Sequence, residues 1–427
     1  MKVLVTGATG FIGHTLCETL QARGHEVVGA SRRVRPSDAG MQWIAIDLAT
    51  AQASDWLVHL RRVDAVVNTV GIFRESAAQR FDDIHIAGPG SLFRGCAEVG
   101  LRRVVQVSAL GADDSAETAY HLTKKAGDDA LLDLVPDAVV VQPSLVFGPG
   151  GPSARAFLTW ASLPALPLPA GGSQPLQPVH VDDVVMAIVV LLETSPSSCR
   201  GARVPLVGPQ ALTLAGYLQA LRDSLGLSPA PTIGIPRAWM AAAARIGDLL
   251  GVGLLDTSSW RMLERGNAAP ADAITALLGK APRAASTFIE ADHSAAALGH
   301  AQLGWLLPLL RLSVALVWIV TGIVSMGVFP VEQSLELLAR SGVPPLLRLP
   351  MLYGAALLDL VLGILTLWPM RRRRWLWITQ AGLIAFYTLV ITVRLPEFWL
   401  HPYGPVLKNL PMLAALLMLA ILDRKER

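Results

Sequence analysis

The sequence contains few charged residues and very few cysteines. Asp, Glu, Lys and Arg make up 16% of its 427 residues, whereas a soluble domain typically carries about 25%. Hydrophobic residues reach 52%, which excludes an intrinsically disordered chain and indicates a protein partly embedded in a membrane. The three cysteines form no CxxC pair and no metal-type spacing. The sequence therefore predicts no disulfide framework, no thiol redox chemistry and no metal site.

A secretory or transit peptide is also not expected, because an apolar strand pattern starts at Lys2 and leads directly into a glycine motif. The charge is distributed unevenly along the chain. From Ala301 onward there are 12 Lys and Arg against 6 Asp and Glu, and six of the eleven Trp lie in this region. Apolar runs that alternate with arginine clusters are typical of membrane segments, so we expect a lipid bilayer and no nucleic acid as a partner.

Long apolar runs are confined to the last 127 residues. Leu312 to Pro330 has no charged residue over 19 positions, close to the roughly 20 that a helix needs to cross the hydrocarbon core. Met351 to Met370 and Trp375 to Val393 are the second and third candidate spans. The fourth, Asn409 to Leu422, has only 14 residues, so it requires an earlier start or a thinner bilayer. We expect an all-α transmembrane four-helix domain over residues 301–427, with three spans as the alternative.

The orientation of these spans follows from their arginines, because short loops rich in Lys and Arg stay on the cytoplasmic side. The Arg371 to Arg374 cluster lies between the second and third spans. This predicts a multi-pass protein of the cell (inner) membrane with the N-terminal domain and the end Asp423 to Arg427 in the cytoplasm. Asp359, inside the second span, has two interpretations: a proton or quinone site, or a packing pair with Arg311 or Arg394.

The tail also carries the stretch HPYGPVLKNLP, from His401 to Pro411, and glycines within apolar runs at Gly322 and Gly354. In these features it resembles the DoxX-like family of small membrane proteins. The resemblance implies a quinone-linked or redox-associated membrane module.

The N-terminal residues 2–22 read KVLVTGATGFIGHTLCETLQA, a short apolar strand, a glycine turn and an amphipathic helix. Gly7, Gly10 and Gly13 have GxxGxxG spacing. Three missing side chains let the turn close, let the backbone approach a pyrophosphate and let the helix pack on the strand. The helix N-terminus adds free N–H groups and a partial positive charge for the phosphates. The sequence therefore predicts a dinucleotide site.

Further strand patterns alternate with helical stretches, which predicts an α/β fold: a Rossmann-like, doubly wound parallel sheet. At the end of the second strand, Ser31, Arg32 and Arg33 stand where NAD-binding proteins place a carboxylate for the ribose 2′-hydroxyl. Two guanidiniums would pair with a 2′-phosphate, so NADP(H) is favoured over NAD(H). Asp47 and Leu48, after the third strand, are placed to bond the adenine. The strands are expected near Glu26 to Ala30, Trp43 to Ile46, Ala65 to Thr69, Val104 to Ser108 and Ala138 to Gln142.

Tyr120 and Lys124 form a YxxxK pair, and four-residue spacing places both on one helix face. Lys124 is expected to lower the pKa of the Tyr120 phenol, which would make it a proton donor or acceptor, and to hold ribose hydroxyls. Ser108, at the end of a strand, is expected to bond the substrate oxygen. Ser108, Tyr120 and Lys124 are thus the predicted catalytic residues.

The motifs TGATGFIG, VSALGA, YHLTK, QPSLVFGPGG and QPVHVDDVVMAI occur in this order over residues 1–295. Together they resemble an extended or atypical short-chain dehydrogenase/reductase of the NAD(P)H-binding group similar to the 39-kDa accessory subunit of respiratory complex I. The resemblance implies Tyr120 as the acid/base, and it places His85 where many reductases have a relay asparagine. Further cofactor-binding residues expected on this basis are Thr9, Phe11, Ile12, Gly71, Pro143 and Val146.

The expected organisation is an NAD(P)-binding domain over residues 1–300, with a small substrate lobe mainly in 150–300, followed by the membrane domain. In the lobe, Leu163 to Pro178 is expected to be an apolar lid, and Pro236 to Leu255 an amphipathic core or membrane-surface helix. Two functions are compatible with this. The first is a membrane-anchored NAD(P)H-dependent oxidoreductase acting on a lipophilic carbonyl, alcohol or quinone-like substrate. The second is a non-catalytic nucleotide-binding module of a membrane redox complex.

Overall fold

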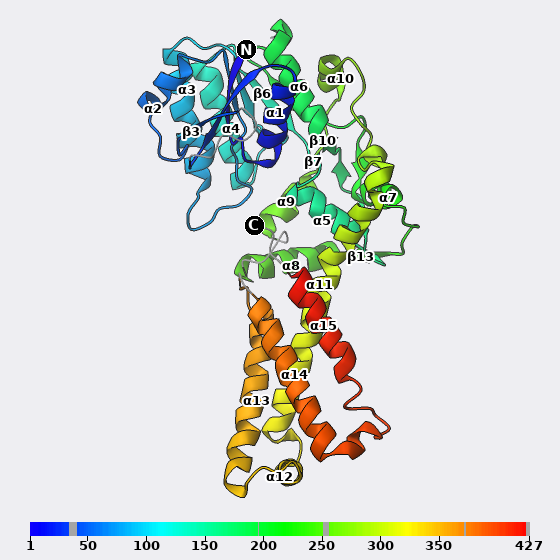
Figure 1. Ribbon diagram of the computed structural model, residues 1–427. Coiled ribbons are helices and arrows are strands. Elements are labelled where there is room, and N and C mark those ends of the chain that lie inside the picture. The colour runs from blue at the N-terminus through cyan, green and yellow to red at the C-terminus, as the bar shows by residue number, and fades with distance from the viewer. Residues whose placement is uncertain (34–40, 195, 251–255, 371–372, 424–427) are drawn as a thin grey trace. The chain divides into compact units, whose positions relative to one another are not determined.

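The computed structural model describes residues 1–33, 41–194, 196–250, 256–370 and 373–423 (Figure 1). The chain divides into two compact units, Met1–Ala301 and Gln302–Arg427.

The first unit is built on a seven-stranded parallel sheet with the strand order β11-β6-β5-β4-β1-β2-β3. Its strand sequences are short apolar runs, as expected for a sheet buried on both faces. The order reverses between β1 and β4, and ligands of such sheets bind at the carboxyl ends of the strands beside this reversal. The strands are β1 (Lys2–Thr6), β2 (Glu26–Ser31), β3 (Gln42–Ala45), β4 (Ala65–Asn68), β5 (Val104–Val107), β6 (Val139–Pro143) and β11 (Arg203–Leu206).

Helices cover both faces of this sheet (Figure 1). Alternate strand residues point to opposite faces: Val3 and Val5 pack in one core with α1 and α6, and Leu4 packs in the other with α2, α3 and α4. The doubly wound sheet predicted from the sequence is thereby confirmed. The covering helices are α1 (Phe11–Ala22), α2 (Ala53–Leu60), α3 (Gly88–Glu98), α4 (Ala119–Leu134) and α6 (Val181–Thr194), and the π-helix η1 (Asp82–Ala87) leads into α3.

Most of the remaining elements of this unit form a smaller lobe around a separate core that includes Leu166, Leu168 and Leu176. The expected lid over Leu163 to Pro178 is wrong. Alternate leucines of this segment point into the lobe core, and its strand β8 pairs with β13. The lobe contains β7 (Val146–Phe147), α5 (Pro152–Ala161), β8 (Leu166–Pro169), β9 (Pro175–Leu176), β10 (Val179–His180), β12 (Leu212–Thr213), α7 (Leu214–Ser224), β13 (Thr232–Ile235), α8 (Arg237–Leu250) and α9 (Thr257–Arg265). The helix α10 (Asp272–Leu278) packs instead on α6, with Ile274 in the core of the large sheet. Residues 251–255 of the expected amphipathic stretch lie outside the described residues.

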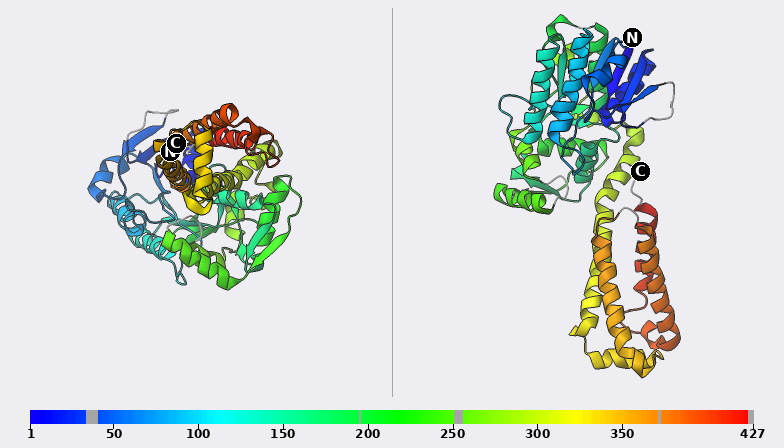
Figure 2. Two further views of the ribbon diagram at one scale, coloured as in Figure 1. Left: turned by 90° about the horizontal axis from the view of Figure 1, so that it is seen from below. Right: turned by 90° about the vertical axis from the view of Figure 1, so that its left-hand side faces the viewer.

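The second unit consists of helices, whose long members run side by side in both views of Figure 2. Three helical segments are long and apolar enough to cross a membrane: Ala291–Val328, Pro345–Leu367 and Arg374–Arg394. The helices are α11 (Ala291–Ile323), which continues into the π-helix η5 (Val324–Val328), α12 (Val331–Arg340), α13 (Pro345–Leu367), α14 (Arg374–Arg394) and α15 (Asn409–Leu422).

The helix α15, which corresponds to the expected fourth span, does not begin before Asn409, so the earlier start considered for that span is wrong. At 1.5 Å per residue its 14 residues reach only about 21 Å. Within the expected basic clusters, Arg371, Arg372 and residues 424–427 lie outside the described residues.

Polar side chains in the second unit link its helices. The indole N–H of Trp318 on α11 donates to Gln380 Oε1 on α14 at 3.0 Å, and Gln380 Nε2 donates to Thr366 Oγ1 on α13 at 2.8 Å. The suggested packing pair between Asp359 and Arg311 is wrong, because Arg311 is bonded to Asp423. Asp359 is buried, and its Oδ1 has no hydrogen-bond partner in the described part of the chain.

Candidate functional site

The glycine turn joins β1 to α1 at the point where the strand order reverses. Gly7 has a φ of +73°, which favours glycine, and a Cβ at this position would lie 2.6 Å from Thr69 Oγ1. A Cβ at Gly13 would lie 2.2 Å from the Gly7 carbonyl oxygen, so the first turn of α1 packs directly on the loop. Gly10 is the N-cap residue of α1, and because it has no side chain the first amides of the helix are not capped by one. The turn therefore fits the backbone cradle that a dinucleotide pyrophosphate requires.

Buried polar side chains connect the carboxyl ends of three neighbouring strands beside this turn. Thr6 Oγ1 donates to Asn68 Oδ1 at 2.5 Å, and Asn68 Nδ2 donates to Gln106 Oε1 at 2.6 Å. The Val70 amide also donates to Asn68 Oδ1, at 3.2 Å. Because each buried group has a partner, this chain of bonds fixes the strand ends and the loop after β4 in one arrangement.

The predicted catalytic pair lies on one face of α4, as its spacing requires. Lys124 is buried, and its Nζ donates to the carbonyl oxygens of Val107 at 3.1 Å and Val70 at 3.4 Å. These carbonyls follow strands β5 and β4, so the ammonium holds α4 against the carboxyl edge of the sheet. A Cβ at Gly71 would lie 2.8 Å from Lys124 Nζ, so the ammonium packs closely against the Gly71 backbone.

Ser108 directly follows β5 and is held there by its amide, which donates to the Val141 carbonyl at 2.8 Å. Its hydroxyl donates to Asp128 Oδ2, and the other oxygen of this fully buried carboxylate has no partner in the described residues. Burial raises the pKa of Asp128, whereas Ser108 and the Lys124 ammonium lower it by smaller amounts. Burial in turn lowers the pKa of Lys124.

The Tyr120 ring is enclosed by aromatic side chains. Its centroid lies 5.1 Å from Phe73, 5.2 Å from His121 and 5.7 Å from His85. Burial, followed by the charge of Asp128, raises the pKa of Tyr120 to about 12. The expected lowering by Lys124 is therefore wrong: the phenol sits in apolar surroundings, and the ammonium bonds backbone carbonyls. At pH 7 Tyr120 keeps its proton and is suited to donate it.

His85 is a buried neutral side chain. Its Nε2 accepts from the Ile72 amide at 3.2 Å, which leaves the proton on Nδ1 to bond Thr123 Oγ1 at 2.9 Å. Burial and the nearby Lys124 lower the pKa of His85 to about 3. The imidazole therefore ties the loop after β4 to α4 and does not exchange protons near neutral pH.

The residues expected to select the cofactor lie at the ends of β2 and β3. Ser31 Oγ donates to the Arg33 carbonyl at 2.5 Å, and both Arg32 and Arg33 are exposed. Asp47 is exposed and accepts from the Ala49 amide at 3.2 Å, whereas Leu48 is buried. The edge thus presents two guanidiniums at the end of β2.

The other expected cofactor residues come from β6, β7 and the start of α1. Pro143 ends β6, and its carbonyl accepts from the Leu110 amide at 2.9 Å. Val146 begins β7 and pairs with Val179. The Phe11 ring packs closely on Gly148, because a Cβ at Gly148 would lie 3.1 Å from Phe11 Cζ. Thr9 and Ile12 lie in and directly after the glycine turn.

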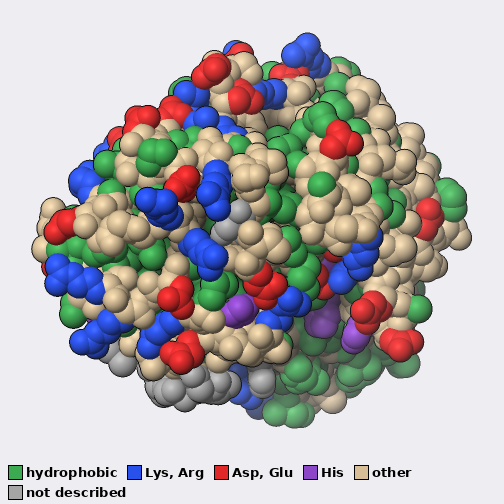
Figure 3. Space-filling model, turned by 90° about the horizontal axis from the view of Figure 1, so that it is seen from above, with side chains coloured by type: hydrophobic (Ala, Val, Ile, Leu, Met, Phe, Trp, Pro, Cys, Tyr) green, Lys and Arg blue, Asp and Glu red, His purple; other side chains and the backbone are tan. Residues whose placement is uncertain are grey.

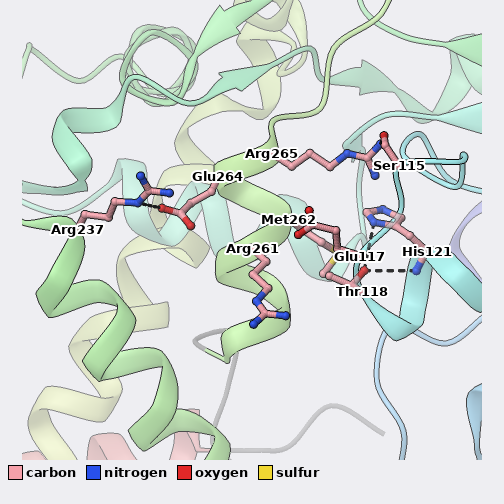
Figure 4. A pocket seen from close by; sticks show the side chains of 9 residues that line it. All are labelled: Ser115, Glu117, Thr118, His121, Arg237, Arg261, Met262, Glu264 and Arg265. Atoms are coloured by element: carbon pink, nitrogen blue, oxygen red, sulfur yellow. Dashed lines mark hydrogen bonds and ion pairs between the residues drawn. The ribbon is translucent and has the colours of Figure 1, made fainter.

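A pocket of about 430 Å³ adjoins Tyr120 through His121. Figure 4 shows Arg265 beside Ser115, the ion pair of Arg237 with Glu264, and Thr118 bonded to His121. Arg265 also bonds Asp113 and the Gly111 carbonyl, which ties α9 to the segment before α4. The lining residues are Ser115, Glu117, Thr118, His121, Arg237, Arg261, Met262, Glu264 and Arg265. All of these side chains except Met262 are charged or polar. By contrast, the face of the molecule in Figure 3 mixes basic and acidic side chains, as on an ordinary solvated surface.

The sequence analysis did not predict Asp128 and Asn68 as residues of the site. Asp128 follows Lys124 by four residues, as Lys124 follows Tyr120, so the helical repeat contains a signal for all three. Asn68 ends an apolar strand, where a single amide is easily taken for the start of a loop.

Comparisons with known proteins agree with this geometry. Residues 3–201 match the NAD dependent epimerase/dehydratase family, and residues 315–417 match the DoxX-like family. Both predicted resemblances are confirmed. The chain therefore combines an NAD-dependent reductase/epimerase-like domain with a DoxX-like membrane domain.

Two relatives indicate the range of related proteins. The chain is 29% identical over 235 residues to the mitochondrial NADH dehydrogenase (ubiquinone) 1 alpha subcomplex subunit 9 of Arabidopsis thaliana, covering 52% of this chain and 57% of that subunit. It is 28% identical over 197 residues to ceramide reductase of Caulobacter vibrioides, covering 45% of this chain and 61% of the reductase. The match thus spans less than two thirds of either relative.

Among solved structures, UDP-glucuronic acid 4-epimerase from Bacillus cereus, in complex with UDP-glucuronic acid and NAD, is similar to the first unit. The TM-score is 0.52 at 19% identity, covering 71% of this chain and 99% of the epimerase. At this identity the likeness shows the fold.

Proposed function

We propose that the first unit, residues 1–300 with its substrate lobe in 150–300, is an NAD(P)H-dependent oxidoreductase of the short-chain dehydrogenase/reductase type. The observation that carries the proposal is the meeting of three elements at one sheet edge. The glycine turn follows β1, Ser108 follows β5, and α4 brings Tyr120 and Lys124 to the same edge. A bound nicotinamide would supply or accept the hydride.

The chain's own residues would handle the substrate oxygen and its proton. Tyr120 donates its phenolic proton to the oxygen of a carbonyl substrate, and Ser108 donates a second hydrogen bond to the same oxygen. Lys124 holds α4, and with it Tyr120, against the strand ends through its bonds to the Val70 and Val107 carbonyls. Ser108 must leave Asp128 to bond a substrate. The raised pKa of Asp128 eases this exchange, because a protonated carboxyl holds the serine less strongly.

The substrate class is inferred from the membrane domain and from the relatives. A domain tied to a bilayer works where lipophilic molecules are concentrated, and one relative is a reductase of ceramide, a lipid. We infer a lipophilic carbonyl or alcohol, or a quinone-like compound. From the arginine-rich loop we infer that the first unit lies on the cytoplasmic side of the cell (inner) membrane. Arg32 and Arg33 favour NADP(H) over NAD(H).

The test is NADPH oxidation by the full chain in detergent, supplied with a membrane lipid extract. Tyr120→Phe is expected to lower turnover by about 100-fold or more, because it removes the proton donor, while nucleotide binding is kept. Tyr403→Phe, which alters an exposed phenol in the second unit, is the matched control and should leave turnover unchanged. Equal turnover in the two variants would rule out this mechanism.

The alternative is a nucleotide-filled structural module of a membrane redox complex. It is favoured by the similarity to a complex I subunit and by His85, which is buried and neutral where a proton relay would need an exchanging group. A structural nucleotide should remain bound through purification and exchange over hours. A catalytic one must exchange within each turnover, so rapid exchange of labelled NADPH would exclude the structural role.

A further inference from the structure

The helix α8 exposes an apolar stripe along one face. Trp239 is 74% exposed, Ile246 55% and Leu249 86%. Steps of seven and three residues return to the same side of a helix, so the three side chains form one row. The small residues Ala242 and Ala243 lie in the same row and are exposed as well.

The other apolar side of α8 is already covered. Met240 and Ala244 are buried against Trp260 of α9. The helix is thus fixed to the lobe by one apolar face, and the exposed stripe is a second face that the fold of the lobe does not need.

Exposed large apolar side chains are concentrated here. Among the described residues of the first unit eight such side chains are exposed, and half of them lie within 17 positions around α8. Soluble proteins rarely expose a continuous apolar patch of this kind unless it meets a partner or a membrane. The eight are Val58, Phe73, Leu122, Leu134, Ile233, Trp239, Ile246 and Leu249.

The charged side chain beside the stripe indicates which kind of partner the stripe contacts. Arg245 lies beside it, is exposed, and forms no ion pair within the described residues. A row of Trp and aliphatic side chains with arginine at its border is typical of helices that lie in the headgroup region of an anionic bilayer. The same chain carries three helical segments able to cross a membrane. These segments would keep the first unit attached to a bilayer.

We propose that the stripe of Trp239, Ile246 and Leu249 docks on the surface of an anionic lipid bilayer, with Arg245 at the phosphates. This contact is independent of the proposed catalysis. Arg237, two residues before Trp239, lines the pocket next to His121. Docking would therefore bring lipid to one side of that pocket.

The test uses the full chain in two kinds of nanodisc, one made of phosphatidylglycerol and the other of phosphatidylcholine. Cys17 and Cys96 are buried, so a Cys199→Ser background leaves a single reactive thiol in Leu249→Cys, which is labelled with a fluorescent probe. Val58→Cys on α2, which alters another exposed apolar residue of the same unit, is the matched control. Quenching is measured with nitroxide lipids and with aqueous iodide.

Lipid quenching is expected to be at least about three-fold stronger at position 249 than at position 58. Arg245→Glu should weaken it in phosphatidylglycerol discs, and Trp239→Asp should weaken it in both kinds of disc. Equal lipid quenching at the two positions would overturn the proposal. Protection from iodide without lipid quenching would also overturn it and would indicate a protein surface, including a second copy of this chain.

Discussion

Buried polar side chains have different roles in the two units. In the first, Thr6, Asn68 and Gln106 form a bonded row at the carboxyl ends of parallel strands, beside a turn with uncapped helix amides. In the second, Gln380 joins Trp318 and Thr366 in the middle of three helices. Both rows satisfy buried donors and acceptors. Only the first lies at a sheet edge where the fold leaves backbone groups for a ligand, so the two rows differ in their position and not in their polarity.

The largest effect is expected where glycine permits close packing. Gly13→Ala would place a Cβ 2.2 Å from the Gly7 carbonyl oxygen, so the turn must distort and NADPH affinity should fall by about 100-fold. In the bundle, Gly363→Ala would place a Cβ 2.5 Å from Ile319 Cγ1, so it should lower the unfolding temperature without affecting NADPH affinity.

Gly234→Ala and Gly382→Ala are the matched controls for this pair, because a Cβ at either position meets nothing within 4 Å. Calorimetric titration with NADPH and thermal unfolding of the full chain in detergent check both effects. A Gly13→Ala protein that binds NADPH like the wild type would contradict the placement of the pyrophosphate.

A second pair of changes tests the two rows of bonded polar side chains, one in each unit. Asn68→Leu removes the hydrogen bonds to Thr6, Gln106 and the Val70 amide, and Gln380→Leu leaves the buried Trp318 indole N–H without an acceptor. Each change should destabilise its unit by about 1–3 kcal/mol. Only Asn68→Leu should also weaken NADPH binding, because it frees the loop after β4. Unfolding and binding are measured on both, with Gln333→Leu, a change of an exposed amide on α12, as control. If Gln380→Leu weakened binding equally, the distinction between the rows would fail.

A smaller effect is expected at the end of β2. The double change Arg32→Ser with Arg33→Ser should weaken NADPH binding about tenfold, or about 1.4 kcal/mol, and leave NADH binding unchanged. NADH is the internal control, because it lacks the 2′-phosphate. Equal loss for both nucleotides would show that the arginines do not read that phosphate.

The smallest effect concerns pH. Burial raises the pKa of Asp128 from 3.8 to about 7, so the folded protein binds its proton more tightly than the unfolded chain does. The stability contributed by this protonation is complete below about pH 4 and is lost as pH rises to about 7. Asp128→Asn should therefore flatten the fall in unfolding temperature between pH 4 and 7. Asp133→Asn, which alters an exposed carboxylate on the same helix, should keep the wild-type slope.

Much of this architecture is readable from the sequence, because the patterns involved are local. Apolar runs gave the strands, and glycine spacing gave the turn between β1 and α1. The YxxxK repeat placed Tyr120 and Lys124 on one helix face.

Contacts between residues far apart in the sequence could not be predicted in this way. The pKa of Tyr120 depends on Phe73 and on the direction of the Lys124 ammonium, and neither follows from spacing. The bond between Ser108 and Asp128 joins residues 20 positions apart on different elements. The pairing of Arg311 with Asp423 likewise depends on how the helices meet. Local patterns therefore predict elements, and the electrostatics of the site requires the fold.

The most direct test of the account is hydride transfer itself. The full chain in nanodiscs is given NADPH deuterated at nicotinamide C4, with a lipid extract, and the lipids are analysed by mass spectrometry. Deuterium is expected to appear in a lipid product with the wild-type protein and with Tyr403→Phe, and not with Tyr120→Phe. Deuterium that stays wholly in the nucleotide, although NADPH is bound, would contradict it.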